Sequence, residues 1–353
     1  MRLYTFYSTG CQRLTSNRIA IRSYGLIESP VDAKMVRRFP RSGDGENPGA
    51  CYGAKRPASG RRTKAPATRL PAVPSRSREA SFSPYTVDLR VGWLTDIHLN
   101  FVVPHKRSRF YAQLREQQLD AILLGGDIGE ANSLTQFLAE IESGLGVPIY
   151  FVLGNHDYYR GSIAGVREAV VRQTAASRWL RWLPTSGVVS LTDHTALVGH
   201  DSWADGRLGH FFRSDVMLND YVVIAELIGL TWAERYAKLN ELGDQAAGYL
   251  GDRVSEALAQ RRNVFVLTHV PPFREACWHE GQISNDDYLP HFACRAVGER
   301  LAAIMRDHPD RRMKVLCGHT HSSGFARILN NLEVFTGGAE YGEPRLQQVF
   351  ELE

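Results

Sequence analysis

Six apolar stretches of strand length in this 353-residue chain are each followed by Asp, Asn or His. The stretches end with Asp96 and His98, with Asp127, with Asn155, His156 and Asp157, with His200 and Asp201, with His269, and with His319 and His321. One such residue after one strand is usually a turn or capping residue. Strands of one sheet, however, point their carboxyl ends at a common edge, so side chains far apart in sequence can meet there. The repetition therefore predicts a single shared site.

The residue types in this set favour metal binding. Carboxylate and imidazole side chains together suit divalent Mn, Fe, Zn, Ni or Co, and the positions offer neither a thiolate set nor an all-oxygen cage. The set offers about seven candidate metal ligands, which are assigned by residue below. Seven ligands are too many for one tetrahedral ion, but they suit two ions that share a bridging carboxylate. The pattern predicts a centre of two divalent metal ions.

The elements that position these residues alternate between strand and helix from about residue 85 onward. Apolar stretches at 89–96, 121–127, 149–157, 195–201, 263–272, 313–321, 324–330 and 332–339 are expected strands. Helices are expected at 106–118, 131–142, 162–183, 230–260 and 294–308, and Thr231 with Glu234 forms a capping box for the fourth. The alternation predicts a layered α/β domain, and the short turn at Asn330 indicates antiparallel strands near its end.

The charge of the chain is divided unevenly. Residues 1–80 carry 16 Lys and Arg against 5 Asp and Glu, a net charge of +11, so the remainder carries 26 against 33, a net charge of −7. A stretch such as RPASGRRTKAPATRLPAVPSRSR, residues 56–78, is typical of disordered, solvated chain. We therefore expect a basic, disordered extension at residues 1–84 and one folded domain at residues 85–353.

The first residues of the chain and its cysteines indicate where in the cell the protein is expected. The first 25 residues are rich in Arg, Ser and Thr and lack acids, which is how an organelle transit peptide is composed, although an extension without any address has the same composition. The chain contains no uncharged apolar run of the roughly 18 to 20 residues that a membrane helix needs. Its five cysteines form no CxxC pair, which indicates reduced intracellular thiols. We expect a cytoplasmic protein without a membrane span, with import into an organelle as the open alternative.

In order along the chain, the polar set reads DxH at 96–98, GD at 126–127, GNHD at 154–157, His269, and GHTH at 318–321. This ordered set resembles the calcineurin-like metallophosphoesterase family and spans nearly the whole expected domain. The resemblance implies a layered α/β/β/α sandwich of mixed sheets, with the metal site at the carboxyl ends of the strands. It also implies an enzyme that hydrolyses phosphoric esters.

The resemblance further implies a role for individual residues. The implied metal ligands are Asp96, His98 and His321 for the first ion, Asn155, His269 and His319 for the second, and Asp127 as the bridge between them. His156 would protonate the leaving oxygen or stabilise the transition state. Glu130 stands where relatives often have an acid that orients this His, but an acid at this position also suits the start of the following helix.

One departure from the family pattern narrows the function. The serine/threonine protein phosphatases of this superfamily have Arg directly after the acid that corresponds to Glu130, whereas this chain has Ala131. Without that phosphate-binding cation, we do not expect the protein to be one of them.

The expected reaction is in-line attack on phosphorus by a hydroxide that bridges the two metals. Two divalent ions facing the two carboxylates of Asp96 and Asp127 keep about two positive charges, which attract a phosphate anion. The metals and His156 would stabilise the charge that develops in the transition state.

The expected substrate is a small phosphodiester or phosphomonoester, such as a nucleotide. His200, Trp278 and His279 are candidate substrate-binding residues, although a strand-tip hydrogen bond for His200 and core packing for the aromatic residues are the alternatives. A single-strand nuclease, which the basic extension would support, and a non-catalytic scaffold are the competing functions. The negative domain argues against a duplex nucleic acid as substrate. Metal identity, the choice between diester and monoester, and the oligomeric state are left open by the sequence.

Overall fold

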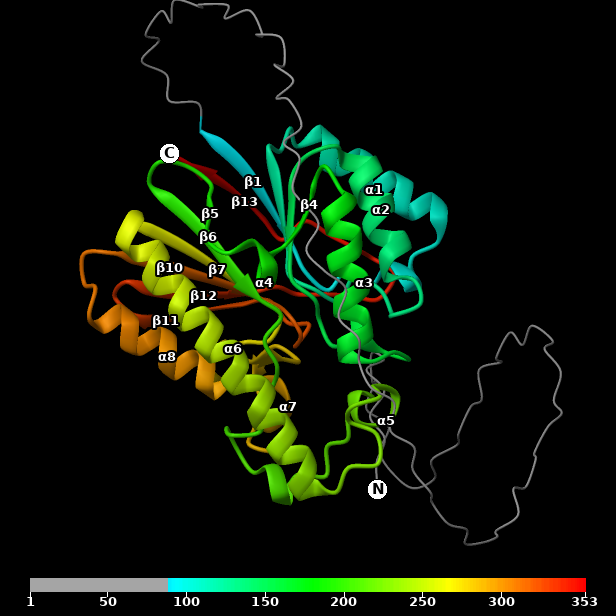
Figure 1. The fold of residues 1–353 in the computed structure, drawn as a ribbon, viewed down its shortest axis with the longest axis vertical. Helices are drawn as coiled ribbons and strands as arrows, with labels where there is room; N and C mark the ends of the chain where they lie inside the picture. The colour runs from blue at the N-terminus through cyan, green and yellow to red at the C-terminus, as the bar shows by residue number, and fades with distance from the viewer. Residues whose placement is uncertain (1–87) are drawn as a thin grey trace, which may run out of the picture. The chain divides into compact units, whose positions relative to one another are not determined.

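The computed structural model describes residues 88–353 of the chain. The expected basic extension at residues 1–84, with its suggested transit peptide, lies outside the described residues, as do residues 85–87 of the expected domain. The described part contains two large β-sheets with helices on their outer faces (Figure 1).

The first sheet has five strands. Their spatial order is β13 (Gln348–Leu352), β1 (Leu89–Leu94), β2 (Ala121–Leu124), β3 (Ile149–Phe151) and β4 (Leu180–Trp182). Strands β1 to β4 are parallel, and β13 pairs with β1 in the antiparallel direction. The carboxyl ends of β1, β2 and β3 therefore lie along one edge.

The second sheet has six strands. Their spatial order is β11 (Gly324–Leu329), β12 (Leu332–Thr336), β10 (Arg312–Cys317), β7 (Asn263–Thr268), β6 (Thr195–His200) and β5 (Val189–Ser190). The four central strands are parallel, whereas β11 and β5 are antiparallel edge strands. A separate hairpin consists of β8 (Trp278–His279) and β9 (Gln282–Ile283). The sheets are thus mixed, as expected.

Helices cover the outer face of each sheet (Figure 1). The helices beside the first sheet are α1 (Pro104–Glu116), α2 (Leu134–Leu145) and α3 (Ile163–Ala176), and those beside the second are α6 (Trp232–Gln260) and α8 (Arg295–Arg306). The shorter helices are α4 (Leu183–Ser186), α5 (Asp220–Val223) and α7 (Leu289–Phe292), with 3-10 turns η1 (Leu99–Phe101), η2 (His156–Tyr158), η3 (Phe211–Arg213) and η4 (Arg274–Ala276). Thr231 and Glu234 form the expected capping box at the start of α6.

Buried side chains of one strand alternate between two cores. In β2, Ala121 and Leu123 pack in the core between the sheets, which Leu197 of the second sheet also enters. The intervening residues Ile122 and Leu124 pack in the core beside α1, α2 and α3. Because both faces are covered, such strands read as continuous apolar runs. The expected α/β/β/α sandwich is confirmed.

The helix expected at 162–183 is too long, because it ends at Ala176. The residues that follow it include β4, in which Leu180 and Trp182 are buried and Arg181 is exposed. This alternation with a period of two is typical of a strand. The antiparallel pairing expected near residue 330 is confirmed for β11 and β12, but β12 pairs with β10 in the parallel direction, and β13 was not expected.

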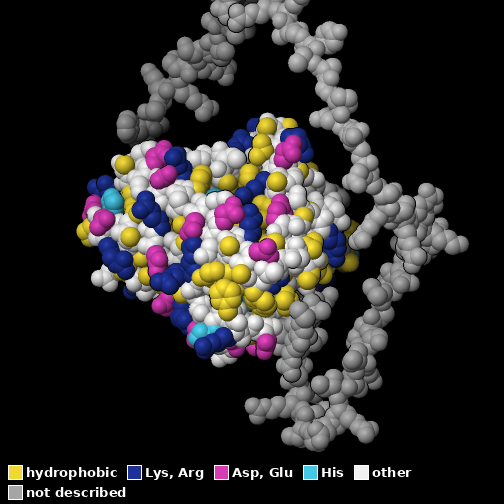
Figure 2. All heavy atoms as spheres, turned by 60° about the horizontal axis from the view of Figure 1, so that its bottom comes forward, with side chains coloured by type: hydrophobic (Ala, Val, Ile, Leu, Met, Phe, Trp, Pro, Cys, Tyr) yellow, Lys and Arg dark blue, Asp and Glu magenta, His cyan; other side chains and the backbone are white. Residues whose placement is uncertain are grey.

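Residues 201–231, here called the β6–α6 segment, join the second sheet to its longest helix. The segment contains only η3 and α5, and it exposes the side chains of Phe212, Val222 and Ile228 by 64%, 49% and 53%. Figure 2 shows the face that includes the lower end of Figure 1, where apolar side chains gather among interspersed charges of both signs. Across residues 88–353, no helix has the length and apolar character needed to cross a membrane.

Candidate metal centre

The polar residues after the strands lie in turns of unusual backbone geometry. Five of them have positive φ angles: Asp96 (51°), His98 (39°), Asp127 (52°), His319 (71°) and His321 (62°). Positive φ is uncommon for residues other than glycine and costs energy, and residues of this kind cluster at functional sites. Backbone hydrogen bonds hold the turns together, because the amides of Asp96 and His98 donate to the carbonyls of Gly126 (3.0 Å) and Asp127 (2.9 Å).

Glycine is required at position 154, where β3 passes into the GNHD turn. A Cβ built on Gly154 would lie 2.1 Å from Asp127 Oδ1 and 2.6 Å from His269 Cε1. Any side chain would therefore displace residues of the centre. The abrupt change from an apolar strand to Gly-Asn-His-Asp follows from this close approach.

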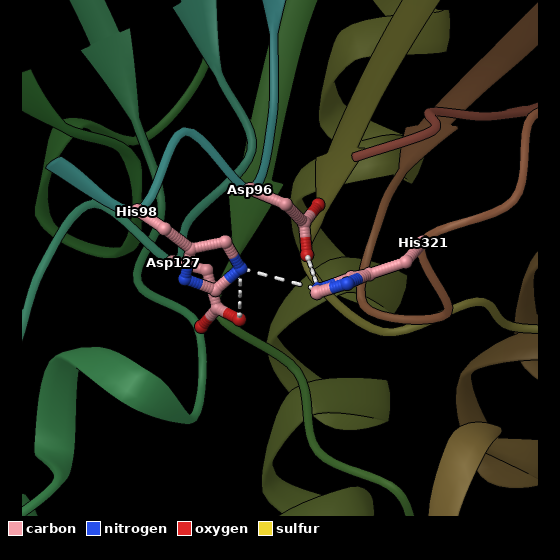
Figure 3. A group of neighbouring side chains, drawn as sticks. All are labelled: Asp96, His98, Asp127 and His321. Carbon is pink, nitrogen blue, oxygen red and sulfur yellow. Dashed lines mark hydrogen bonds and ion pairs between the residues drawn. The ribbon is translucent and has the colours of Figure 1, made fainter. Parts of the chain in front are cut away.

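Asp96, His98, Asp127 and His321 form one group whose ligand atoms all lie within 4.8 Å of one another (Figure 3). His98 Nε2 lies 3.1 Å from His321 Nε2 and 3.7 Å from Asp127 Oδ2, and His321 Nε2 lies 3.5 Å from Asp96 Oδ1. The two aspartates and His98 are buried. This group matches the ligand set expected for the first ion.

Asn155, His269 and His319 form a second group on the other side of Asp127. Asn155 Oδ1 lies 3.0 Å from both His269 Nε2 and His319 Nδ1, and Asp127 Oδ1 lies 3.4 Å from His269 Nε2. The two oxygens of Asp127 thus face different groups, since Oδ2 faces His98. The structure brings all seven expected ligands together in this arrangement.

The hydrogen bonds of the second group leave only lone pairs facing one another. His269 Nδ1 donates to the carbonyl of Gly125 (2.9 Å), and His319 Nε2 donates to the carbonyl of His291 (3.0 Å). When the two rings are in the neutral form that binds metal, these bonds select the tautomers in which the nitrogens that face Asn155 Oδ1 carry no proton. Three acceptors at such distances repel one another unless a cation lies among them. The donor set therefore fits a divalent cation.

The ionisation of the centre also suits a cation. Burial lowers the pKa of His98 and of His319 well below the ordinary value, and neighbouring imidazoles lower both further. Burial also lowers the pKa of His321, so these three rings are neutral at pH 7, which is the form that binds metal. Burial raises the pKa of Asp127 well above its usual range, and the nearby Asp96 adds to this. A bound cation would counteract that rise.

His156 lies beside both groups at the mouth of the centre. Its backbone amide donates to Asp127 Oδ1 (2.9 Å), its ring stacks on Tyr159 at 4.2 Å between centroids, and its Nε2 lies 3.9 Å from Asp127 Oδ2. Burial, and then the surrounding imidazoles, lower the pKa of His156 well below its ordinary value. The ring is placed to contact a molecule bound at the metals.

Glu130 forms an ion pair with Arg160. Its carbonyl oxygen accepts a hydrogen bond from the amide of Leu134 (2.8 Å), the first residue of α2. These contacts place Glu130 in the turn that leads into α2, which begins at Leu134 with Ser133 as its N-cap, so Glu130 does not itself start the helix. A role in orienting His156 stays a prediction.

The expected substrate-binding residues have different surroundings. His279 Nδ1 lies 3.4 Å from the carbonyl of Thr320, between the two histidines of the GHTH turn, so its ring is near the centre. The ring of Trp278 packs over Gly324. His200 Nδ1 accepts from the amide of Ser202 (3.0 Å), and its ring lies 5.3 Å from that of Tyr249 on α6. The contacts of His200 fit the strand-tip alternative, and its substrate role stays a prediction.

The neighbouring Asp201 is buried in a hydrogen-bond network. Its carboxylate accepts from the amide of Leu153, the hydroxyl of Tyr158 and the indole of Trp182, at 2.8 to 2.9 Å. This carboxylate joins the two sheets beside the centre.

Four residues around the centre were missed by sequence reasoning. Asp157 was noted but given no role, and its carboxylate accepts from three backbone amides of the turns that follow β2 and β3. Tyr341 lies with its ring 4.6 Å from that of His98, and the carbonyl of His291 holds His319. Asp220 is hydrogen-bonded to Asn155. Of these four residues, only Asp157 lies in one of the sequence motifs, GNHD.

The sequence matches the profile of the calcineurin-like phosphoesterases over residues 89–323. The chain belongs to this family and is a metallophosphoesterase, an enzyme that hydrolyses phosphoric esters. Among proteins of curated function, none matches the sequence.

The chain also aligns with solved structures of low sequence identity. A phosphopantetheinyl hydrolase from Mycobacterium tuberculosis aligns with a TM-score of 0.51 and 11% identity, over 73% of this chain and 92% of that one. A dimetal phosphatase from Danio rerio aligns with a TM-score of 0.49 and 14% identity, over 75% of this chain and 92% of that one. At 11% identity, the similarity to the phosphopantetheinyl hydrolase shows a shared fold and nothing about the activity of this chain.

Proposed function

We propose that the protein hydrolyses a small phosphodiester or phosphomonoester at a centre of two divalent metal ions. Asp96, His98 and His321 hold the first ion, Asn155, His269 and His319 hold the second, and Asp127 bridges them. The observation that supports this most is the position of Asp127, whose two carboxylate oxygens face the two ligand groups separately.

The bound ions supply Lewis acidity and lower the pKa of coordinated water toward 7. The residues of the chain set the charge and geometry of the site. With only Asp96 and Asp127 as carboxylate ligands, about two positive charges remain to attract a phosphate anion. Asn155, His269 and His319 are each fixed by hydrogen bonds on their far side, so their ligand atoms need little rearrangement when an ion binds.

His156 acts as a hydrogen-bond donor to the reacting phosphoryl group or to the leaving oxygen. Its backbone amide is tied to Asp127, and its ring is held against Tyr159, which fixes its direction relative to the bridge. Because burial keeps the ring neutral in the free protein, stabilisation through an N–H bond is favoured over transfer from a charged imidazolium.

The mouth of the centre favours a small substrate. A cavity of about 10 Å³ lies among Asp127, His156, Leu218, Asn219 and Tyr341, which is room for about one water molecule. Leu218, Asn219 and Tyr341 therefore border the space in which a substrate would approach the metals. Lys and Arg alternate with Asp and Glu over the described part of the face in Figure 2, which does not suit a duplex nucleic acid.

The test is metal-dependent hydrolysis by purified protein supplied with Mn, Zn, Ni or Fe. Substrates are an aryl phosphodiester, an aryl phosphomonoester, cyclic nucleotides and a single-stranded oligonucleotide. Asp127→Asn should abolish hydrolysis, and His156→Ala should reduce turnover with bound metal nearly unchanged. The matched control is His105→Ala, which changes an exposed histidine on α1 and should leave both quantities unchanged. Full activity of Asp127→Asn would contradict the assignment.

A further inference from the structure

A carboxylate from the β6–α6 segment contacts one of the metal ligands. Asp220 is buried at the start of α5, and its Oδ1 accepts hydrogen bonds from Asn155 Nδ2 (2.8 Å) and the Tyr159 hydroxyl (2.8 Å). Asn155 Nδ2 also donates to the Tyr159 hydroxyl oxygen (3.1 Å). The three side chains form a closed triangle of hydrogen bonds beside the second ligand group.

This triangle determines which amide atom of Asn155 faces the second ion. Its amide nitrogen points at two oxygen atoms, so Oδ1 is left 3.0 Å from both His269 Nε2 and His319 Nδ1. Turning the amide over would bring its oxygen against the carboxylate of Asp220, where no proton lies between them. Asp220 therefore holds Asn155 in the orientation that a metal ion requires.

The β6–α6 segment also has contacts that do not involve Asp220. The amide of Arg160 donates to the carbonyl of Val223 (2.9 Å), and the amide of Ala225 donates to the carbonyl of Gly161 (3.0 Å). The carboxylate of Glu226 accepts from the first two amides of α3 at 2.8 and 3.1 Å. Because none of these contacts uses the side chain of Asp220, replacing that residue should remove only the hydrogen bonds of the triangle.

The residues just before Asp220 line the mouth of the centre. Leu218 and Asn219 border the small cavity that His156 and Tyr341 also line. One short stretch, residues 218–220, thus shapes the entrance and holds a metal ligand. A movement of this stretch that admits substrate also acts on Asn155.

We propose that Asp220 is a positioning residue for the second metal ion and that it couples the β6–α6 segment to the occupancy of that ion. The inference rests on the metal assignment proposed above. Coupling between two sites is reciprocal, so the ion should in turn hold the segment in place.

The test titrates Mn²⁺ by calorimetry into metal-free wild-type protein, Asp220→Ala and Asp220→Asn, with bound metal counted by mass spectrometry. Alanine removes both accepted hydrogen bonds, whereas asparagine keeps an oxygen that accepts them. We expect Asp220→Ala to weaken one of two binding events by about 10- to 100-fold and leave the other unchanged, with partial recovery in Asp220→Asn.

The matched control is Asp205→Asn in the same segment. Asp205 is also buried, but its carboxylate accepts from the amides of Arg207 (3.1 Å) and Ala296 (2.9 Å), neither of which belongs to the proposed ligand groups. A structural effect alone lowers the Tm of either variant without changing Mn²⁺ affinity. Hydrogen exchange of residues 218–226 gives a second readout, because Mn²⁺ should slow it in the wild type and not in Asp220→Ala.

The outcomes separate this inference from the proposed function. Two ions bound with equal affinity by wild type and Asp220→Ala overturn the inference alone. A wild-type protein that binds no Mn²⁺, Zn²⁺, Ni²⁺ or Fe²⁺ overturns the proposed function. If Asp220→Ala does not fold, Asp220→Leu also removes both accepted hydrogen bonds while filling the space of the carboxylate, and an unchanged Mn²⁺ affinity in that variant overturns the inference.

Discussion

Replacing Gly154 by alanine should displace the bridging carboxylate. A Cβ at this position would lie 2.1 Å from Asp127 Oδ1, so the carboxylate must shift by about 1 Å to restore a separation of 3.0 Å. The new methyl group would also lie 2.6 Å from His269 Cε1. Gly154 is not among the glycines with positive φ, so the added methyl group acts by steric contact rather than by backbone strain.

The magnitude follows from that shift. Misplacing a catalytic group by about 1 Å costs on the order of 100-fold in rate, and overpacking costs about 1 to 3 kcal/mol of folding free energy. We therefore expect Gly154→Ala to lower kcat/KM for an aryl phosphodiester by about 100-fold or more. Bound Mn²⁺ should fall as well, because Asp127 contributes to both ligand groups.

The assay combines steady-state kinetics at saturating Mn²⁺ with metal analysis and urea unfolding. The control is Gly248→Ala on α6, where a Cβ would meet nothing within 4 Å and alanine favours the helix. This control should keep wild-type kinetics and equal or greater stability. Wild-type kcat/KM and metal content in Gly154→Ala would refute the close approach on which the geometry of the centre depends.

Three further predictions concern the first ion, acid stability and the capping box. Gly318→Ala should weaken one Mn²⁺ in calorimetry, because the new Cβ would collide with the carboxylate of Asp96; unchanged binding would contradict this. Burial lowers the pKa of His291 to about 3 from 6.5, so metal-free protein should lose stability as pH falls from 6.5 toward 3, by at most about 1.4 kcal/mol per pH unit from this group. Urea unfolding of His291→Gln should show a shallower loss, and equal slopes would argue against a neutral buried ring. Thr231→Ala should cost about 0.5 to 2 kcal/mol in urea unfolding through loss of the capping box of α6, whereas no change would show that the cap adds nothing.

The sequence was sufficient to predict the convergence of the ligands. Asp127 and His269 are 142 residues apart and follow parallel strands of different sheets, β2 and β7, yet their side chains approach to 3.4 Å, so the site forms between the strand ends of two sheets rather than at the edge of one. The fold class followed from the alternation of apolar strands with helices. These predictions depend on the apolar periodicity, which the local sequence determines, and on the helices that join successive strands, which favour parallel pairing.

The site residues that the sequence did not predict lie in the connecting segments between the main strands and helices, and the path of such a segment cannot be read from its local sequence. Asp220 and Tyr341 come from segments without periodicity, so nothing in the sequence indicates which loop reaches Asn155 or covers His98. The local sequence at Glu130 suits both a helix start and an orienting acid, and its partner Arg160 lies in a turn with φ of 62°. The strand β4 was read as helix because three residues are too few for a period to stand out.

We propose that two metal ions lie on either side of the Asp127 carboxylate. Anomalous X-ray diffraction from a crystal of the wild-type protein grown with Mn²⁺ tests it most directly. The proposed assignment predicts two anomalous peaks, one among Asp96, His98 and His321 and the other among Asn155, His269 and His319. A single peak, or peaks away from Asp127, would contradict it.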